Sequence, residues 1–314
     1  MRVGWLGVGA MGAPMAARAA RSGHAVHAYD KTAQRAAALA PAGVRPAETI
    51  AAAVTGADVV AVMVATPGQV EQVLFAPGGA AESLAAGAVV MIMTTAGPAA
   101  VASAAGRLAA TGVAVVDAPV SGGTQRAAAG DLLIMVSGPP GPVTRAQPLL
   151  AALARSAPVV GPDPGDGQRM KLVNQLLCGV HIAAAAEALA FAESLGLQAE
   201  RCWQVLREGA AASFMFDDRG ARMVAAQFGE ARSAMDIFVK DMGLVSEAAG
   251  QAGASVPLTA VARRLYDRGH ELGMGRLDDS ALIEVLRRDR GLPPRGLPPR
   301  GLPAPPAGQG PADG

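Results

Sequence analysis

The sequence predicts an α/β fold in which a doubly wound, mostly parallel sheet is followed by an all-α domain. Up to about residue 163, short apolar runs alternate with alanine-rich segments of helical character. This alternation is typical of parallel strands joined by crossover helices. Beyond that point strand-like runs stop, and helical patterns continue to residue 289. We therefore expect one domain over residues 1–163 and a second over residues 164–289.

Short apolar runs, several of them rich in valine, mark the expected strands. They lie at residues 2–6, 25–29, 59–64, 89–94, 113–117, 132–136 and 158–160. Helices are expected at residues 11–22, from 165 to about 195, and at 201–208, 215–225, 234–252, 258–273 and 280–288. Because ligands bind such sheets beyond the carboxyl ends of the strands, residues just after these runs are candidates for a site.

Composition excludes several classes of function. The 314 residues carry 27 Lys and Arg against 26 Asp and Glu, so we expect no nucleic-acid surface and no polybasic membrane arm. No uninterrupted apolar run is long enough to span a bilayer. Cys178 and Cys202 are too few for a disulfide framework and lack metal-ligand spacing. A cytoplasmic protein without a bound metal is expected.

A glycine motif follows the first expected strand at once and opens a helix. Gly7, Gly9 and Gly12 have the spacing GxGxxG, with Ala10 and Met11 between the last two. This is the dinucleotide-binding fingerprint of a Rossmann-type sheet. The first glycine allows the tight turn, the second lets a pyrophosphate approach the backbone, and the third lets the helix pack on the strand. All five residues are expected to contact the cofactor.

Asp30 ends the second expected strand, roughly 20 residues after the glycine motif, as the fingerprint requires. A carboxylate there accepts hydrogen bonds from the adenosine ribose and repels a 2′-phosphate. NAD is therefore expected rather than NADP. Lys31 and Arg35 lie close enough to weaken the exclusion of NADP. The alternative is that Asp30 is only a turn residue at a strand end.

Two further strand ends are candidates for the cofactor cleft. Val64 is the last residue of the third expected strand, Ala65 follows it, and Thr95 follows the fourth. Their position beyond parallel strands lets them line a bound dinucleotide. Ordinary capping at a strand-to-helix junction explains these residues nearly as well.

The segment 117–124 also follows a strand and contains Ser121, Gly122 and Gly123. The serine offers a hydroxyl, and the glycines free backbone N–H groups that can bind an anion. We expect this loop to bind substrate. A simple β-turn is the alternative.

A glycine break at residues 165–167 precedes the longest expected helix. Lys171, Asn174 and Gln175 stand at i, i+3 and i+4 and therefore share one helical face. A cation and two carboxamides near a helix start, where the partial positive charge favours a carboxylate, suit a polar substrate. The alternative is a solvated polar patch on the first turns.

The last segment, residues 290–314, begins with repeats of Arg-Gly-Leu-Pro-Pro and then consists mostly of Pro, Gly and Ala. Such a composition cannot bury a core. We expect this segment to be a disordered, linker-like tail whose removal leaves folding and activity nearly unchanged.

Taken together, these stretches resemble the β-hydroxyacid dehydrogenase family, which includes 3-hydroxyisobutyrate dehydrogenases. The resemblance covers nearly everything from residue 1 to 289. Residues 7–16 match the family's cofactor loop, 117–123 its substrate loop, 165–174 its catalytic segment and 240–241 its C-terminal lysine. The proline-rich tail lies outside the family pattern.

The resemblance implies NAD-dependent oxidation of a CH–OH group in a small hydroxy acid, with Lys171 as the general acid and base. It implies that Asn174 and the Ser121–Gly123 loop hold the substrate. It also implies that Thr95 and Lys240 line the cofactor or the active site, although Lys240 could equally be a surface lysine paired with a nearby acid. A homodimer or homotetramer is expected.

One departure bears on the substrate. Many family members carry Asn-Asn after the lysine, whereas this chain has Asn174-Gln175. The Asn-Gln form resembles the sugar-acid branch, which contains tartronate semialdehyde reductases and L-threonate dehydrogenases. The expected reaction is oxidation of L-threonate to 2-oxo-tetronate, with Gln175 contacting a further hydroxyl. Alternatives are tartronate semialdehyde or 3-hydroxyisobutyrate as substrate, an imine reductase, and an NAD-binding protein without turnover.

Overall fold

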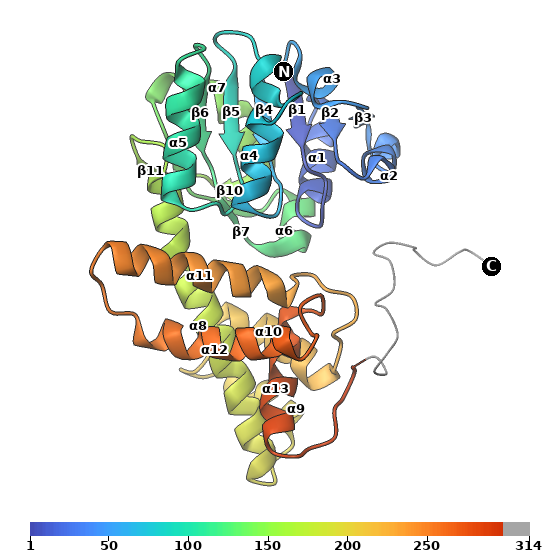
Figure 1. The fold of residues 1–314 in the computed structure, drawn as a ribbon. Coiled ribbons are helices and arrows are strands. Elements are labelled where there is room, and N and C mark those ends of the chain that lie inside the picture. The colour runs from blue at the N-terminus through green and yellow to red at the C-terminus, as the bar shows by residue number, and fades with distance from the viewer. Residues whose placement is uncertain (298–314) are drawn as a thin grey trace, which may run out of the picture. The chain divides into compact units, whose positions relative to one another are not determined.

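The computed structural model describes residues 1–297 of the chain. Its contacts divide the chain after Asn174 into two compact units. The division lies inside the long helix α8 (Asp166–Ser194), later than the boundary expected at residue 163. Figure 1 shows a sheet-containing first unit and a helical second unit.

The first unit contains an eight-stranded sheet in the order β11-β9-β6-β5-β4-β1-β2-β3. All neighbouring strands are parallel except β6 and β9. The strands are β1 (Arg2–Leu6), β2 (Ala25–Tyr29), β3 (Arg45–Pro46), β4 (Val59–Val62), β5 (Val89–Ile92), β6 (Ala114–Asp117), β9 (Val136–Ser137) and β11 (Val159–Gly161). The chain proceeds from β1 to β3 and then returns to β4 on the other side of β1. This reversal is the doubly wound topology, so the predicted fold class is confirmed.

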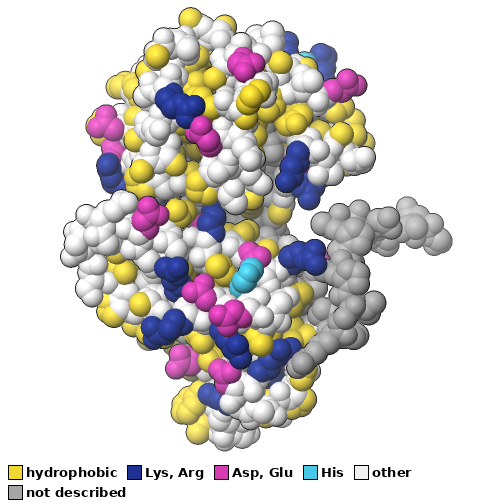
Figure 2. All heavy atoms as spheres, viewed as in Figure 1, with side chains coloured by type: hydrophobic (Ala, Val, Ile, Leu, Met, Phe, Trp, Pro, Cys, Tyr) yellow, Lys and Arg dark blue, Asp and Glu magenta, His cyan; other side chains and the backbone are white. Residues whose placement is uncertain are grey.

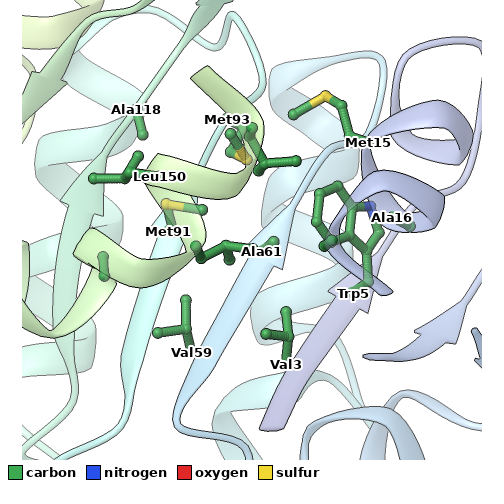
Figure 3. Close-up of a cluster of buried hydrophobic side chains, with 14 of the residues drawn as sticks. Val3, Trp5, Met15, Ala16, Val59, Ala61, Met91, Met93, Ala118 and Leu150 are labelled. Atoms are coloured by element: carbon green, nitrogen blue, oxygen red, sulfur yellow. The ribbon is translucent and has the colours of Figure 1, made fainter. Parts of the chain in front are cut away.

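Two apolar cores cover the two faces of this sheet. One face packs against α1 (Gly12–Arg21) and α7 (Pro140–Leu153). The other packs against α3 (Ile50–Val54), α4 (Pro67–Phe75) and α5 (Pro98–Ala109). Figure 3 shows Trp5 of β1 beside Ala16 of α1 within the first core. The small alanine side chain lets the helix lie close to the strand, and the Trp5 indole N–H donates to the Gly7 carbonyl at 3.1 Å.

One expected strand proves to be two. The run at residues 132–136 divides into β8 (Leu132–Ile134), in a separate three-stranded sheet, and β9, in the main sheet. The partners of β8 are β7 (Val120–Ser121) and β10 (Ala154–Ser156). Between the two strands, the Met135 N–H donates to the Pro119 carbonyl at 3.0 Å. A continuous apolar run does not indicate which distant carbonyl each residue will bond, so the pattern could not predict this division.

The second unit is helical, as predicted. Besides the rest of α8 it contains α9 (Ala199–Leu206), α10 (Phe214–Ala225), α11 (Met235–Gln251), α12 (Pro257–Glu271) and α13 (Leu282–Asp289). Phe238 of α11 stacks on Tyr266 of α12 with ring centroids 5.3 Å apart, and the Tyr266 hydroxyl donates to the Gly179 carbonyl of α8. A Cβ on Gly179 would lie 2.7 Å from the Met242 side chain. Glycine at this position therefore lets the end of the Met242 side chain of α11 lie directly against α8, and a larger residue would displace that flexible side chain.

By length and composition α8 could cross a membrane, but half of its most apolar window is buried inside the protein. Core helices of soluble proteins show the same pattern, so α8 is weak evidence for a membrane span. Figure 2 shows basic and acidic side chains intermixed on the visible face, in keeping with a net charge of +1.

Part of the expected tail makes contacts with the second unit. The Arg290 side chain donates to the Ala190 carbonyl and the Ser194 hydroxyl of α8. The backbone N–H of Arg295 donates to the Glu284 carboxylate of α13 at 3.0 Å. The low-complexity composition did not predict these hydrogen bonds between residues 290–297 and the helices α8 and α13. The remainder of the expected tail, residues 298–314, lies outside the described residues.

A buried cluster of charges joins α10 to the turn before α13. Arg219 binds Asp279 through two hydrogen bonds of 3.0 Å, and Arg222 binds Asp278. Asp218 accepts hydrogen bonds from both arginines. Burial alone would raise the pKa of Asp218, but the charges of Arg219 and Arg222 outweigh burial and hold that pKa below its ordinary value.

This shift makes Asp218 a source of acid-sensitive stability. A carboxyl group whose pKa is lower in the folded state stabilises the fold above its unfolded pKa of about 3.9, and that stabilisation is lost as the pH falls through the folded pKa. Asp218→Asn should therefore lower the free energy of unfolding by about 1–3 kcal/mol at pH 7, with the deficit shrinking below about pH 4. Urea titrations over a pH series measure this. Asp267→Asn, which affects an exposed ion pair on α12, is the control with little change. A deficit independent of pH would contradict the assignment.

Candidate active site

The three glycines of the motif after β1 differ in what surrounds them. Gly7 has a φ of +94°, and a Cβ there would lie 2.6 Å from the Met63 carbonyl oxygen. A Cβ on Gly12 would collide with the carbonyl of Gly7. Gly9, by contrast, has no heavy atom within 4 Å of the place of a Cβ. Folding therefore requires glycine at positions 7 and 12, whereas Gly9 faces open space.

Asp30 ties the end of β2 to this turn. Its Oδ2 accepts a hydrogen bond from the Val8 N–H at 3.0 Å, and its Oδ1 accepts one from the Thr32 N–H at 2.9 Å. The Arg35 guanidinium lies 3.8 Å from Oδ1. The carboxylate thus has a structural role at the strand end, which is the alternative that the sequence left open. Because it contacts Val8, the carboxylate also lies next to the glycine turn.

The ends of β4 and β5 lie together at the same edge of the sheet. The Thr94 hydroxyl donates to the Val64 carbonyl at 2.9 Å, which holds the segments containing Ala65 and Thr95 side by side. Thr66 caps α4 by accepting the N–H of Gln69 at 3.2 Å. Capping therefore accounts for Thr66. Val64, Ala65 and Thr95 lie where a sheet of this topology binds ligands.

The loop after β6 has the backbone form that its glycines indicated. Ser121 ends β7 and is half-buried, and Gly122 and Gly123 have φ values of +142° and +76°. Residues with side chains rarely adopt these angles, so the loop requires both glycines. A Cβ on Gly123 would meet nothing within 4 Å, so its backbone faces open space.

Helix α8 carries the candidate catalytic residues. Lys171 is only 5% exposed and Asn174 is half-buried, so the solvated patch considered from the sequence is not what the structure contains. The two residues are three apart in a 29-residue helix and share one face. Both belong to the first unit.

Gln175 and Lys240 belong to the second unit and bind the same acid there. The Gln175 side-chain amide donates to Oδ2 of Asp241, which is 1% exposed. Lys240 Nζ lies 2.9 Å from the other oxygen of that carboxylate. The pairing of Lys240 with a nearby acid, which the sequence left as an alternative, is thus present.

Sequence reasoning missed Asp117, Ser137 and Gln168. Asp117 is fully buried at the end of β6 and accepts two backbone N–H groups from the start of α8, those of Gly165 and Gln168. Burial raises the pKa of Asp117, while the hydrogen bonds from Gln168, Gly165 and Ser137 oppose that rise. The available signal was an acid directly after an apolar strand. Within residues 1–297 no three His, Cys, Asp or Glu side chains form a metal site.

Two family models together match most of the chain. The NAD-binding domain of 6-phosphogluconate dehydrogenase matches residues 2–161, and the NAD-binding domain of NADP-dependent 3-hydroxyisobutyrate dehydrogenase matches residues 165–286. An L-threonate dehydrogenase from Cupriavidus necator is 38% identical over 90% of this chain and 95% of its own length.

The chain belongs to the β-hydroxyacid dehydrogenase family.

Other members bear out this assignment. A 2-(hydroxymethyl)glutarate dehydrogenase from Eubacterium barkeri is 32% identical over 93% of this chain and 97% of its own length. A crystal structure described as 3-hydroxyisobutyrate dehydrogenase from Salmonella typhimurium has a TM-score of 0.86 and 36% identity, covering 91% of this chain and 99% of that one. The protein is therefore an oxidoreductase that acts on hydroxyl groups with a nicotinamide cofactor.

The first unit of this β-hydroxyacid dehydrogenase fits such a cofactor. The strand, turn and helix of the fingerprint are present, and the two glycines that the fold requires hold the turn against its neighbours. The open space at Gly9 is where a pyrophosphate approaches the backbone in this motif. The acid at position 30 stands at the end of β2, the usual place for a ribose contact.

The open space at Gly9 predicts a separation of stability from cofactor binding. Gly9→Ala should change the free energy of unfolding by less than about 0.5 kcal/mol, because the new methyl group meets no protein atom. It should raise the cofactor Kd at least tenfold, about 1.4 kcal/mol, because that methyl group takes the space of the pyrophosphate. Cofactor fluorescence titration and thermal unfolding measure the two quantities.

Gly106→Ala is the matched control, since its Cβ also meets nothing but lies within α5. It should leave the cofactor Kd unchanged and stabilise the helix by about 0.5–1 kcal/mol. An unchanged Kd for Gly9→Ala would show that no ligand group approaches this turn.

Proposed function

We propose that this β-hydroxyacid dehydrogenase oxidises a small sugar acid, with L-threonate as the best candidate, to the corresponding 2-oxo acid while NAD is reduced. The observation that carries the proposal is Lys171, buried on the second turn of α8 with Asn174 on the same face. Burying a lysine is costly unless its ammonium group is paired and hydrogen-bonded or loses its proton, so a buried lysine beside polar side chains is a candidate for chemistry. The relative from Cupriavidus necator named L-threonate dehydrogenase and the Asn174-Gln175 pair support the substrate class.

In this mechanism Lys171 Nζ, in its neutral form, takes the proton of the substrate hydroxyl. Burial in general favours the neutral form of a lysine, which is the form that can accept a proton. A bound nicotinamide cofactor would supply the acceptor for the hydride that leaves the carbon bearing this hydroxyl. The O–H and C–H bonds break as the C=O bond forms. In the reverse direction the Lys171 ammonium returns the proton to the carbonyl oxygen.

The neighbouring residues bind the substrate and orient it for this reaction. Ser121 and the backbone N–H groups of Gly122 and Gly123 hold the substrate carboxylate, which suits a backbone form that glycine permits at both positions and the open space at Gly123. Asn174 orients the substrate or the lysine from the same helical face. Gln175 and Lys240 are retained as candidates for substrate and cofactor contacts, each held by Asp241.

Three further proposals concern the cofactor, the assembly and the localisation of the protein. Asp30 supports NAD, although Arg35 lies 3.8 Å away and one matching family model is named for an NADP-dependent enzyme. We propose a homodimer or homotetramer, supported by large apolar side chains exposed on the second unit, such as Phe191, Leu195 and Leu197. We also propose that the protein is cytoplasmic and acts without nucleic acid or membrane. Light scattering tests the assembly.

Lys171→Ala should lower kcat by about 10²- to 10⁴-fold, the usual contribution of a general acid or base. The cofactor Kd should stay nearly unchanged, because the glycine turn lies after β1. Lys171→Arg should not restore activity, because guanidinium does not deprotonate at the working pH. Asn174→Ala should weaken substrate binding and turnover less severely. Steady-state rates and cofactor titration measure these effects, and a near-normal kcat for Lys171→Ala would make Lys171 a binding residue only.

The substrate and cofactor are decided by one assay, NADH or NADPH formation over a panel of small hydroxy acids. L-threonate with NAD should give the highest kcat/KM, ahead of 3-hydroxyisobutyrate and of glycerate, the acid whose oxidation gives tartronate semialdehyde. Asp30→Asn should narrow the preference for NAD, because the amide no longer repels a 2′-phosphate but keeps one acceptor for the backbone. Equal or better use of NADP by the unaltered protein would overturn the cofactor assignment. Cofactor binding without turnover on any hydroxy acid would favour the non-catalytic alternative.

A further inference from the structure

The side chain of Gln168, the third residue of α8, is fully buried and fully hydrogen-bonded. Its Nε2 donates to Asp117 Oδ1 at 2.7 Å and to the Thr94 carbonyl at 3.1 Å. Its Oε1 accepts the backbone N–H groups of Ala96 at 2.9 Å and Gly97 at 3.1 Å. These four bonds use both donors and both acceptor positions of the amide, so one side chain joins α8 to two strand ends.

Asp117 holds the backbone of the same turn. Its Oδ2 accepts the Gly165 N–H at 3.0 Å, the Gln168 N–H at 2.9 Å and the Ser137 hydroxyl at 3.3 Å. The Ser137 oxygen in turn accepts the Gly167 N–H at 2.9 Å. The first N–H groups of a helix have no partner within the helix. Here a carboxylate and a hydroxyl from the sheet supply the partners.

The side of the helix start at Gly167 also has no free space around it. A Cβ on Gly167 would lie 2.6 Å from the Met135 carbonyl and 2.9 Å from Asp117 Oδ2. Backbone therefore lies directly against backbone here. The depth and rotation of the first turn of α8 are fixed by contact as well as by hydrogen bonds.

These constraints reach the residues proposed for chemistry. Lys171 is three residues after Gln168, and residues at this spacing lie one above the other on a helix. The N–H groups that Gln168 binds, those of Ala96 and Gly97, immediately follow Thr95. The same amide thus fixes the turn that precedes the lysine and the segment proposed to line the cofactor.

We propose that Gln168 and Asp117 are positioning residues that hold Lys171 and the Thr95 segment in one fixed arrangement for proton transfer. The proposal rests on the proposed function, because it assigns the network a purpose only if Lys171 exchanges a proton with the substrate. A network that merely stabilised the fold would also be rigid and fully bonded. The two roles predict different results for a folded variant that lacks the network. A positioning role predicts a lower kcat, and a purely structural role predicts a normal one.

Gln168→Met keeps the volume of the side chain and removes all four of its hydrogen bonds. It should lower kcat about 10- to 100-fold, because displacement of a catalytic group by about 1 Å costs this much, while the KM for the hydroxy acid changes less than about threefold. Arg169→Met is the matched control on the same turn, since Arg169 is exposed and pairs only with Asp166 among the ion pairs of the described residues. Its kcat should stay within about twofold of the unaltered protein.

The decisive measurement is the same substitution in a Lys171→Ala background. If Gln168 acts through Lys171, then Gln168→Met should not lower the residual kcat of Lys171→Ala further. Independent, multiplying losses would overturn the proposal, as would a folded Gln168→Met protein with normal kcat. A normal kcat for Lys171→Ala alone would instead refute the general acid and base role of Lys171 in the proposed function, so the two failures are distinguishable.

Ser137→Ala provides the same test if Gln168→Met does not fold. It removes a single hydroxyl, which bonds Gly167 and Asp117. A smaller fall in kcat, about 3- to 10-fold, is expected, and it too should vanish in the Lys171→Ala background. A fall that persists in that background would overturn the positioning role.

Discussion

The buried carboxylate of Asp117 is the constraint on which the first unit's site depends. A helix that begins inside a protein brings several unpaired N–H groups with it, and leaving them unpaired costs about 1–3 kcal/mol each. Asp117 stands at the carboxyl end of β6 and accepts two of these groups. Burial raises its pKa, but the hydrogen bonds favour the charged form and limit that rise. An ionised acceptor makes stronger hydrogen bonds than a neutral one, so the same group that burial penalises is well suited to hold the helix start.

Asp30 has a similar role at the end of β2, which lies nearer the opposite edge of the sheet. It too ends a parallel strand, and it accepts the Val8 N–H of the glycine turn. In both places an acid after an apolar strand fixes the backbone that leads into a helix, α1 in one case and α8 in the other. Asp30, which we propose as the ribose contact, therefore also fixes the shape of the turn. A substitution at this position would change that turn together with any effect on the cofactor.

The sequence predicted the elements whose signal is local, and it could not predict those that depend on distant partners. The strands β1, β4, β5 and β6 are buried on both faces and appear as nearly continuous apolar runs, and α8 follows a glycine break that marks its start. Spacing alone also placed Lys171 and Asn174 on one face of that helix. The division of residues 132–136 between two sheets depends on carbonyls of Pro119 and Pro158, which no local pattern identifies. Gln168 was missed for the same reason, because its four partners lie 51 to 74 residues away.

The Asn174-Gln175 pair shows that the residue type at a motif position can be required for more than one reason. In the second unit the amide of Gln175 donates to Asp241, which is 1% exposed and also pairs with Lys240. A shorter asparagine side chain lacks the methylene that extends Gln175 toward this carboxylate, and a buried acceptor that loses a donor costs free energy. The glutamine therefore satisfies a buried acid as well as distinguishing this chain from members with Asn-Asn. Asp241 therefore determines where both the Gln175 amide and the Lys240 ammonium are held.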